Sequence, residues 1–223
     1  VHEAGGLVYY DGANLNAMLG KAKPGRMGFD IVHINIHKTF ATPHGGGGPG
    51  SGPIAVTKQL DRFLPVPTVE RADGKYYLEF DRPESIGKIT SFWGNAAVLV
   101  RAYAYILMMG HDGLEEVADI STLNANYLAK KLSEIRGIDL PFPGKFRKHE
   151  FVLSAAKMAG ETGVTAAHLS KRLLDFGIHP PTVYFPLIVQ EAMMIEPTET
   201  VSKQELDETV TAFSKASAEA YTG

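Results

Sequence analysis

One short segment limits the possible folds of this chain more than any other, because it sets a lysine beside a glycine-dense turn. The mostly apolar run 31–36 leads directly into His37 and Lys38. Residues 43–53 then contain four consecutive glycines and three prolines. Glycines let backbone amides approach a ligand phosphate or a neighbouring subunit, and prolines restrain the turn. We therefore expect Lys38 at the carboxyl end of a strand, next to a restrained turn.

A second apolar run, 7–10, ends in an acidic turn. Asp11 follows this run directly, and Gly12 and Ala13 come next. Short runs of Val, Ile and Tyr between turn-forming residues are typical of strands in a well-covered sheet. Ligands of open α/β sheets bind outside the carboxyl ends of the strands. The sequence therefore predicts that Asp11 and Lys38 lie at one edge of a sheet.

A carboxylate and an amine in this arrangement are the two charges that pyridoxal 5′-phosphate needs. A lysine bonds to the aldehyde of this cofactor only as the free amine, and the apolar Ile34 and Ile36 before Lys38 could desolvate it. A carboxylate on the pyridine nitrogen keeps the ring able to accept electrons, and Asp11 is the candidate. The small Ala13 would let the flat ring approach closely. The plainer alternative is a solvent-exposed lysine and a turn-forming aspartate.

Further candidate residues surround the lysine. His37 or His44 is expected to hydrogen-bond the cofactor or substrate, with local structural bonding as the alternative, and His37 is the candidate for a catalytic role beside Lys38. The backbone of Gly47 and Gly48 is expected to contact the cofactor. The glycine run formally matches G-x-G-x-x-G, but a strand follows where a dinucleotide fold requires a helix. We predict no metal site among the histidines here, because their spacing does not suit a strand and no acidic ligand accompanies them. His149 and Glu150 offer an acid–base pair, or two exposed side chains.

Composition excludes several classes of function. The formal net charge is −3, from 22 basic and 25 acidic residues without long blocks of one sign, so neither nucleic acid nor an anionic membrane is an expected partner. The chain has no cysteine, which fits a reducing compartment. The longest apolar stretch, 95–109, is too short to cross a membrane. Because no secretory signal is visible, we expect a cytoplasmic protein. The chain opens just before a strand, so we expect a fragment or one piece of a split protein.

The patterns along the chain predict three parts. Residues 1–110 are expected to form the end of a large, mainly parallel sheet domain, 111–137 a connecting helix ended by Gly137, and 138–223 a small α+β domain. Further strands are expected at 53–56, 75–80, 151–153, 182–185 and 193–195, and a helix at 165–176. Ser202 and Glu205 form a capping box that predicts the start of a last helix.

In four stretches of its sequence the chain resembles a known family, the glycine cleavage system P-protein, or glycine decarboxylase (glycine dehydrogenase, aminomethyl-transferring). The matching stretches are 11–14, 33–40, 43–53 and 195–199. The similarity covers nearly the whole chain, from Gly5 to about Phe213, and corresponds to the C-terminal half, or second subunit, of that protein. It implies the fold-type I architecture of pyridoxal phosphate-dependent enzymes. In it Lys38 matches the Schiff-base lysine and Asp11 the partner of the pyridinium nitrogen.

The resemblance also implies a reaction and partners. Glycine would be decarboxylated, and the remaining aminomethyl group would pass to the lipoyl arm of the H-protein. The expected partners are glycine, the lipoylated H-protein and the N-terminal P-protein half or subunit, in an oligomer. Activity is expected only with that N-terminal half, which carries most other cofactor contacts in the family. Two alternatives stay open: a non-catalytic, partner-binding fragment of the same fold, and another fold-type I enzyme acting on a small amino acid.

Overall fold

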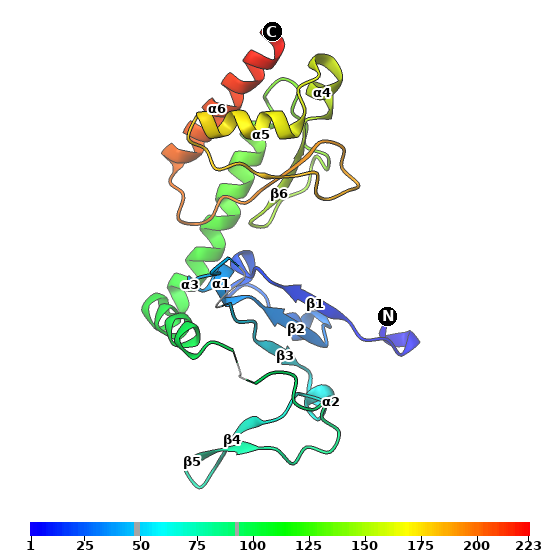
Figure 1. Cartoon of the computed structure of the whole chain (residues 1–223), viewed down its shortest axis with the longest axis vertical. Helices are drawn as coiled ribbons and strands as arrows, with labels where there is room; N and C mark the ends of the chain where they lie inside the picture. Colours follow the sequence, from blue (N-terminus) through cyan, green and yellow to red (C-terminus); the bar gives the residue numbers. More distant parts are fainter. Residues whose placement is uncertain (47–49, 92–93) are drawn as a thin grey trace. The chain divides into compact units, whose positions relative to one another are not determined.

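The chain forms two compact units, Val1–Leu114 and Glu115–Gly223. The computed structural model describes residues 1–46, 50–91 and 94–223, and Figure 1 shows the order of their elements. The division between the units falls inside helix α3 (Ala96–Leu132). The three domain boundaries expected from the sequence stay a prediction. In the described part of the chain, no helix is long and apolar enough to cross a membrane.

A three-stranded sheet forms the centre of the first unit. Its strands, in spatial order, are β1 (Tyr9–Gly12), β2 (Ile31–Ile34) and β3 (Ile54–Val56). β1 runs parallel to β2, with Asp11 opposite His33, whereas β3 is antiparallel to β2. The three strands expected in this region are therefore confirmed, although their ends differ. β2 stops at Ile34 because the short helix α1 (Ile36–Thr39) begins two residues later.

A small apolar core holds α1 in place. Ile36, only 4% exposed, packs with Val98 and Ala102 from the first part of α3, and Phe40 packs against this group. Helix α3 is interrupted at Gly110, whose φ of 64° and ψ of −171° are not helical. A residue with a side chain adopts such a positive φ only at a cost, so glycine suits this break. The first part of α3 thereby fixes the position of the helix that carries Lys38.

The rest of the first unit is a ribbon with short helices. β4 (Thr68–Ala72) and β5 (Lys75–Glu79) pair antiparallel through a turn at Asp73 and Gly74, both with positive φ. β5 confirms the strand expected at 75–80, but its partner β4 was not anticipated. The short helices are η1 (His2–Ala4), η2 (Asn16–Met18), η3 (Pro24–Met27) and α2 (Lys58–Asp61).

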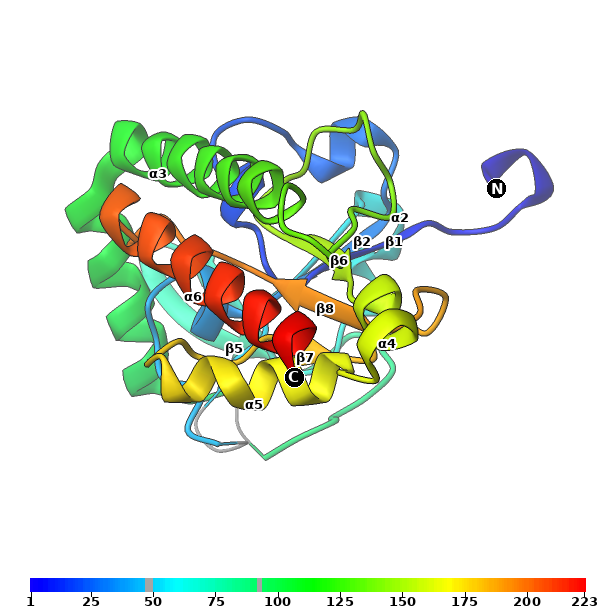
Figure 2. The ribbon, with the colours of Figure 1, turned by 90° about the horizontal axis from the view of Figure 1, so that it is seen from above.

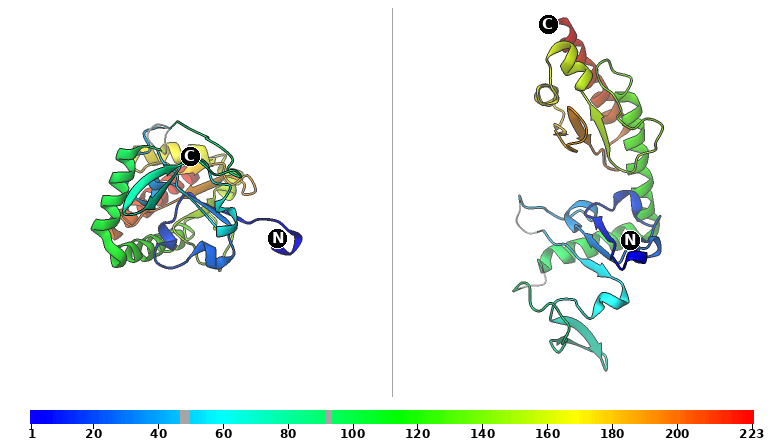
Figure 3. Two further views of the ribbon diagram at one scale, coloured as in Figure 1. Left: turned by 90° about the horizontal axis from the view of Figure 1, so that it is seen from below. Right: turned by 90° about the vertical axis from the view of Figure 1, so that its right-hand side faces the viewer.

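The second unit is an antiparallel sheet covered by helices. The strand order is β6 (Phe151–Ser154), β8 (Ala192–Ile195) and β7 (Thr182–Val183), and the helices are α4 (Ala156–Thr162), α5 (Ala166–Asp175) and α6 (Lys203–Thr222). Figure 2 shows α5, α6 and the later turns of α3 on one side of these strands, and the right-hand view of Figure 3 shows α6 beside the later turns of α3. Phe151 and Leu153, alternate residues of β6, are buried in this core with Met193 and Phe213.

The last helix begins where its capping box predicts. The Glu205 backbone N–H donates to Ser202 Oγ at 3.3 Å, and the Ser202 N–H donates to Glu205 Oε2 at 2.7 Å. These bonds satisfy donors that a helix N-terminus otherwise leaves unpaired. A second capping box, between Thr165 and His168, starts α5 and was not expected, because histidine replaces the usual Glu or Gln.

Candidate active site

Asp11 lies near the end of β1 with its carboxylate open to solvent. The Ala13 backbone N–H donates to Asp11 Oδ1 at 3.0 Å, and His33 Nε2 lies 3.3 Å from the same oxygen. The Tyr9 hydroxyl is 2.6 Å from His33 Nδ1, and the two rings stack. His33 Nδ1 can therefore accept a hydrogen bond from the Tyr9 hydroxyl while His33 Nε2–H donates to the Asp11 carboxylate. The Asp11 side chain is 73% exposed, so the carboxylate is oriented and still accessible to a ligand.

Gly12 allows β1 and β2 to approach closely at this point. A Cβ added to Gly12 would lie 2.6 Å from the His33 carbonyl oxygen and 3.1 Å from Leu15 Cδ2. Atoms do not approach so closely without a shift of the backbone, so only glycine fits here. Gly12 was expected only as part of a turn; its packing requirement follows from the pairing of two strands, which the sequence alone does not display.

Lys38 lies in α1, not at the end of the strand itself. Asn35 separates β2 from α1, and the Lys38 backbone N–H donates to the Asn35 carbonyl at 3.2 Å. Ile36 and Thr39 point into the protein, being 4% and 2% exposed, whereas Lys38 is exposed. Ile36 therefore packs against α3, and Lys38 stays exposed within this chain.

Hydrogen bonds connect the segments that follow β1 and β2. The Asn35 N–H donates to the Ala13 carbonyl at 3.3 Å, and the Leu15 N–H donates to Thr39 Oγ1 at 2.8 Å. The parallel pairing of β1 and β2 already sets both carboxyl ends at one edge of the sheet. The structure thus brings the segments that carry Asp11 and Lys38 together at that edge.

His37 lies partly buried next to His44. The two rings meet edge to face with centroids 4.8 Å apart. Burial lowers the pKa of His37 below its usual value, and the nearby charges of His44 and Lys38 lower it further. His37 Nδ1 is buried and has no hydrogen-bond partner among the described residues. A neutral imidazole with an unsatisfied buried nitrogen is suited to bind a polar group of a ligand.

The glycine turn is only partly described. Gly47 and Gly48 lie outside the described residues. Gly50 follows them, and a Cβ at Gly50 would come within 3.1 Å of His37 Nδ1. A cavity of about 900 Å³ begins at Gly50 and Ser51 and extends to residues of β4, to 88–91 and to 94–95. Its lining includes none of Asp11, His37 and Lys38, so this cavity is next to the glycine turn and not at the candidate site.

The fold is that of one class of protein, the fold-type I pyridoxal phosphate-dependent enzymes. A solved structure of glycine decarboxylase (P-protein) of the glycine cleavage system, in inhibitor-bound form, matches with a TM-score of 0.79 and 25% identity, over 96% of this chain and 49% of that chain. Glutamate decarboxylase of Lactobacillus brevis matches with a TM-score of 0.66 and 18% identity, over 97% of this chain and 48% of that one. The expected fold class is therefore confirmed.

Sequence comparison shows which known proteins the chain is similar to. Residues 117–222 match the model of the glycine dehydrogenase C-terminal domain. The probable glycine dehydrogenase (decarboxylating) subunit 2 of Pyrococcus abyssi is 62% identical over 100% of this chain. The match covers 44% of that relative, so the chain spans less than half of its length. The chain is thus homologous to glycine dehydrogenase (decarboxylating) subunit 2 and matches the C-terminal half of the P-protein, as the resemblance implied.

Proposed function

We propose that this chain supplies the lysine that binds pyridoxal 5′-phosphate in a glycine decarboxylase. The complete enzyme would decarboxylate glycine and transfer the aminomethyl group to the lipoyl arm of the H-protein. The observation that carries this proposal is the joining of the segments of Asp11 and Lys38 at one sheet edge, in a chain 62% identical to subunit 2 of the Pyrococcus abyssi enzyme.

The residues at this edge fit the cofactor. Asp11 offers an exposed carboxylate, Lys38 an exposed amine, and His37 a buried nitrogen without a partner among the described residues. Ala13 adds little bulk beside Asp11. Pyridoxal phosphate, when bound, supplies an electron sink that stabilises the electron pair left by the departing carboxylate. Gly47 and Gly48 remain proposed contacts.

Each side chain would have a separate task. Asp11 would accept a hydrogen bond from the protonated pyridine nitrogen, and the Ala13 N–H and His33 would hold its carboxylate in orientation. Lys38 Nζ would hold the cofactor before substrate arrives and, once displaced, would be free to carry a proton. His37, kept neutral by its lowered pKa, would bind a polar group of the cofactor or substrate and take part in catalysis.

The complete site needs a partner. Lys38 and Asp11 are exposed here, and desolvation is what makes a lysine amine nucleophilic. We propose that the N-terminal P-protein half or subunit covers this edge, in a cytoplasmic oligomer that binds glycine and the lipoylated H-protein. The same exposure favours a second candidate function, a partner-binding fragment of the same fold that does not hold the cofactor.

A cofactor titration separates these two functions. Pyridoxal phosphate is added to the chain alone and to the chain mixed with the complementary half, and the visible absorbance of the lysine-bound cofactor is recorded. We expect saturable absorbance in the mixture, which Lys38→Ala abolishes and the matched control Lys58→Ala, on an exposed residue of α2, leaves intact. A band that persists in Lys38→Ala would refute the assignment. Exchange of the glycine carboxyl carbon with labelled bicarbonate then tests the reaction itself.

A further inference from the structure

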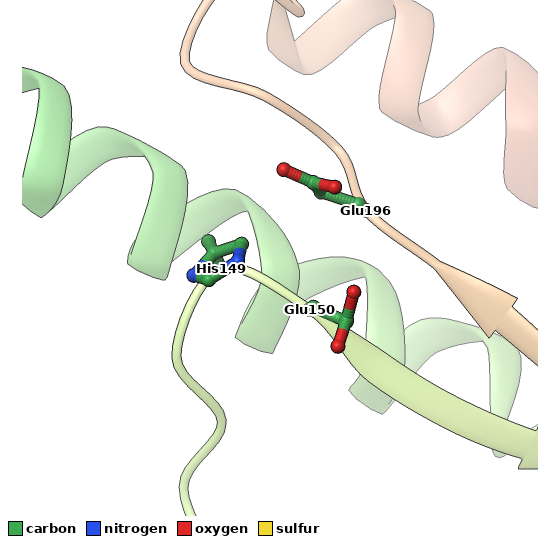
Figure 4. Close-up of side chains that lie close together, drawn as sticks. All are labelled: His149, Glu150 and Glu196. Atoms are coloured by element: carbon green, nitrogen blue, oxygen red, sulfur yellow. The ribbon is translucent and has the colours of Figure 1, made fainter. Parts of the chain in front are cut away.

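A second cluster of ligand-type side chains lies in the second unit. His149, Glu150 and Glu196 each offer one ligand atom, a nitrogen and two carboxylate oxygens, and these atoms lie within 4.8 Å of one another. Figure 4 shows the three side chains close together. We propose that these three side chains bind a divalent transition-metal ion such as Zn²⁺. The proposed function makes no use of these residues.

The pairing of two strands explains why the carboxylates meet. β6 and β8 are antiparallel, with Phe151 opposite Ile195. One step further in the same register, Glu150 comes opposite Glu196, and His149 precedes Glu150 in the chain. Like charges directly opposite on neighbouring strands are destabilising. A bound cation would attract both carboxylates at once and so favour their approach.

The segment before His149 and the segment after Glu196 are both hydrogen-bonded to helix α3. Asn126 of α3 donates to the Arg147 carbonyl at 2.7 Å and accepts the Arg147 N–H at 2.8 Å, close before His149. Asn124 of α3 donates to the carbonyls of Thr198 and Val201 at 2.9 and 3.0 Å, shortly after Glu196. Ligands held on fixed segments lose less conformational freedom when a metal binds.

The chemistry of the three ligands selects the ion. Imidazole nitrogen favours Zn²⁺ and its transition-metal neighbours, whereas Mg²⁺ and Ca²⁺ prefer oxygen ligands alone. Bonds to Zn²⁺ are about 2.0–2.2 Å long, so the side chains must close in slightly, as glutamates can by changing rotamer. Both glutamates are exposed, which leaves coordination positions to water. The site is therefore open and exchangeable, unlike a closed four-ligand structural site.

Equilibrium dialysis of the metal-stripped chain against Zn²⁺, without pyridoxal phosphate, tests the proposal. We expect one ion per chain, and a loss of affinity of at least about tenfold in His149→Gln and in Glu196→Gln, since even outer partners of a metal site contribute about 10–100-fold. His37→Gln and His179→Gln are matched controls and should bind like the unaltered chain. The His37 control is included because the rings of His37 and His44 also lie close together, with centroids 4.8 Å apart.

Thermal unfolding supplies a second readout. Zn²⁺ should raise the melting temperature of the unaltered chain and of His37→Gln but not of His149→Gln, because an ion that binds only the folded state stabilises it. If His149→Gln does not fold, Glu150→Gln and Glu196→Gln carry the comparison. Three results would overturn the proposal: adventitious binding only, binding lost in His37→Gln and kept in His149→Gln, or equal binding of Mg²⁺. Because cofactor is absent throughout, none of them bears on the proposed function.

Discussion

Replacing Gly12 with alanine tests whether the close approach of β1 and β2 shapes the candidate site. The new Cβ would lie 2.6 Å from the His33 carbonyl oxygen, against at least 3.4 Å for ordinary contact, so the strands must separate by about 0.8 Å. This atom belongs to the backbone and cannot rotate away. Overpacking of this kind costs about 1–3 kcal/mol. We expect a loss of that size in the free energy of unfolding.

The matched control for this change is Gly25→Ala. No atom lies within 4 Å of a Cβ built there, and the residue is not in the left-handed region. Alanine at such a position stabilises a protein by about 0.4–1 kcal/mol, because it reduces the freedom of the unfolded chain. Urea unfolding of both variants measures the difference directly. Cofactor affinity in the presence of the complementary half should also fall in Gly12→Ala, since Asp11 is its neighbour. Equal stability and equal cofactor affinity in the two variants would refute the packing argument.

Three further predictions concern the electron sink, the second core and the acid response. Asp11→Asn should still bind cofactor but lose most turnover of the reconstituted enzyme, because an amide does not hold the pyridine nitrogen protonated; unchanged kcat would contradict its role. Leu153→Ala should lower the unfolding free energy by about 2–5 kcal/mol in a denaturant titration, since Leu153 is 0% exposed, whereas Leu174→Ala at an exposed site should change it little. Hydrogen bonds from His2 and then from the Val8 N–H lower the pKa of Asp30, so its stabilising effect is present above the ordinary value of 3.8 and is lost as the pH falls below it. Asp30→Asn should therefore flatten the decline of melting temperature below pH 4, and an unchanged acid profile would argue against this linkage.

Local patterns were sufficient to predict much of the fold. The strands near 7–10, 31–36 and 151–153 follow from runs of β-branched and aromatic residues. The start of α6 follows from Ser202 and Glu205, whose side chains and backbones bond each other. Such features depend on neighbours in the sequence and need no knowledge of the tertiary structure.

Other elements depended on contacts that the sequence does not display. α1 forms directly after β2 because Ile36 is buried against α3, some 60 residues away in the sequence. The sequence does not display this contact, and a strand was therefore expected to continue to Ile36. α4 has only one buried residue, Met158, and so shows no apolar period. β4 could have been found, because Asp73 and Gly74 are a typical two-residue hairpin turn.

The candidate site, too, could be predicted from the sequence only in part. The residue types at Asp11 and Lys38 suggested the chemistry, and the parallel pairing of β1 with β2 accounts for their common edge. The need for glycine at position 12 and the meeting of Glu150 with Glu196 both require the strand register, which joins distant segments. The exposure of Lys38 within this chain likewise depends on the tertiary structure, because the neighbouring Ile36 and Thr39 are the buried residues of α1.

Reductive trapping tests the central claim most directly. The chain, its complementary half and pyridoxal phosphate are mixed, treated with borohydride to fix the cofactor to its lysine, and digested for peptide mass spectrometry. Our account predicts the cofactor mass on the peptide containing Lys38, and its loss from the digest when glycine is added before reduction. Stable labelling of a different lysine, with Lys38 unmodified, would contradict it.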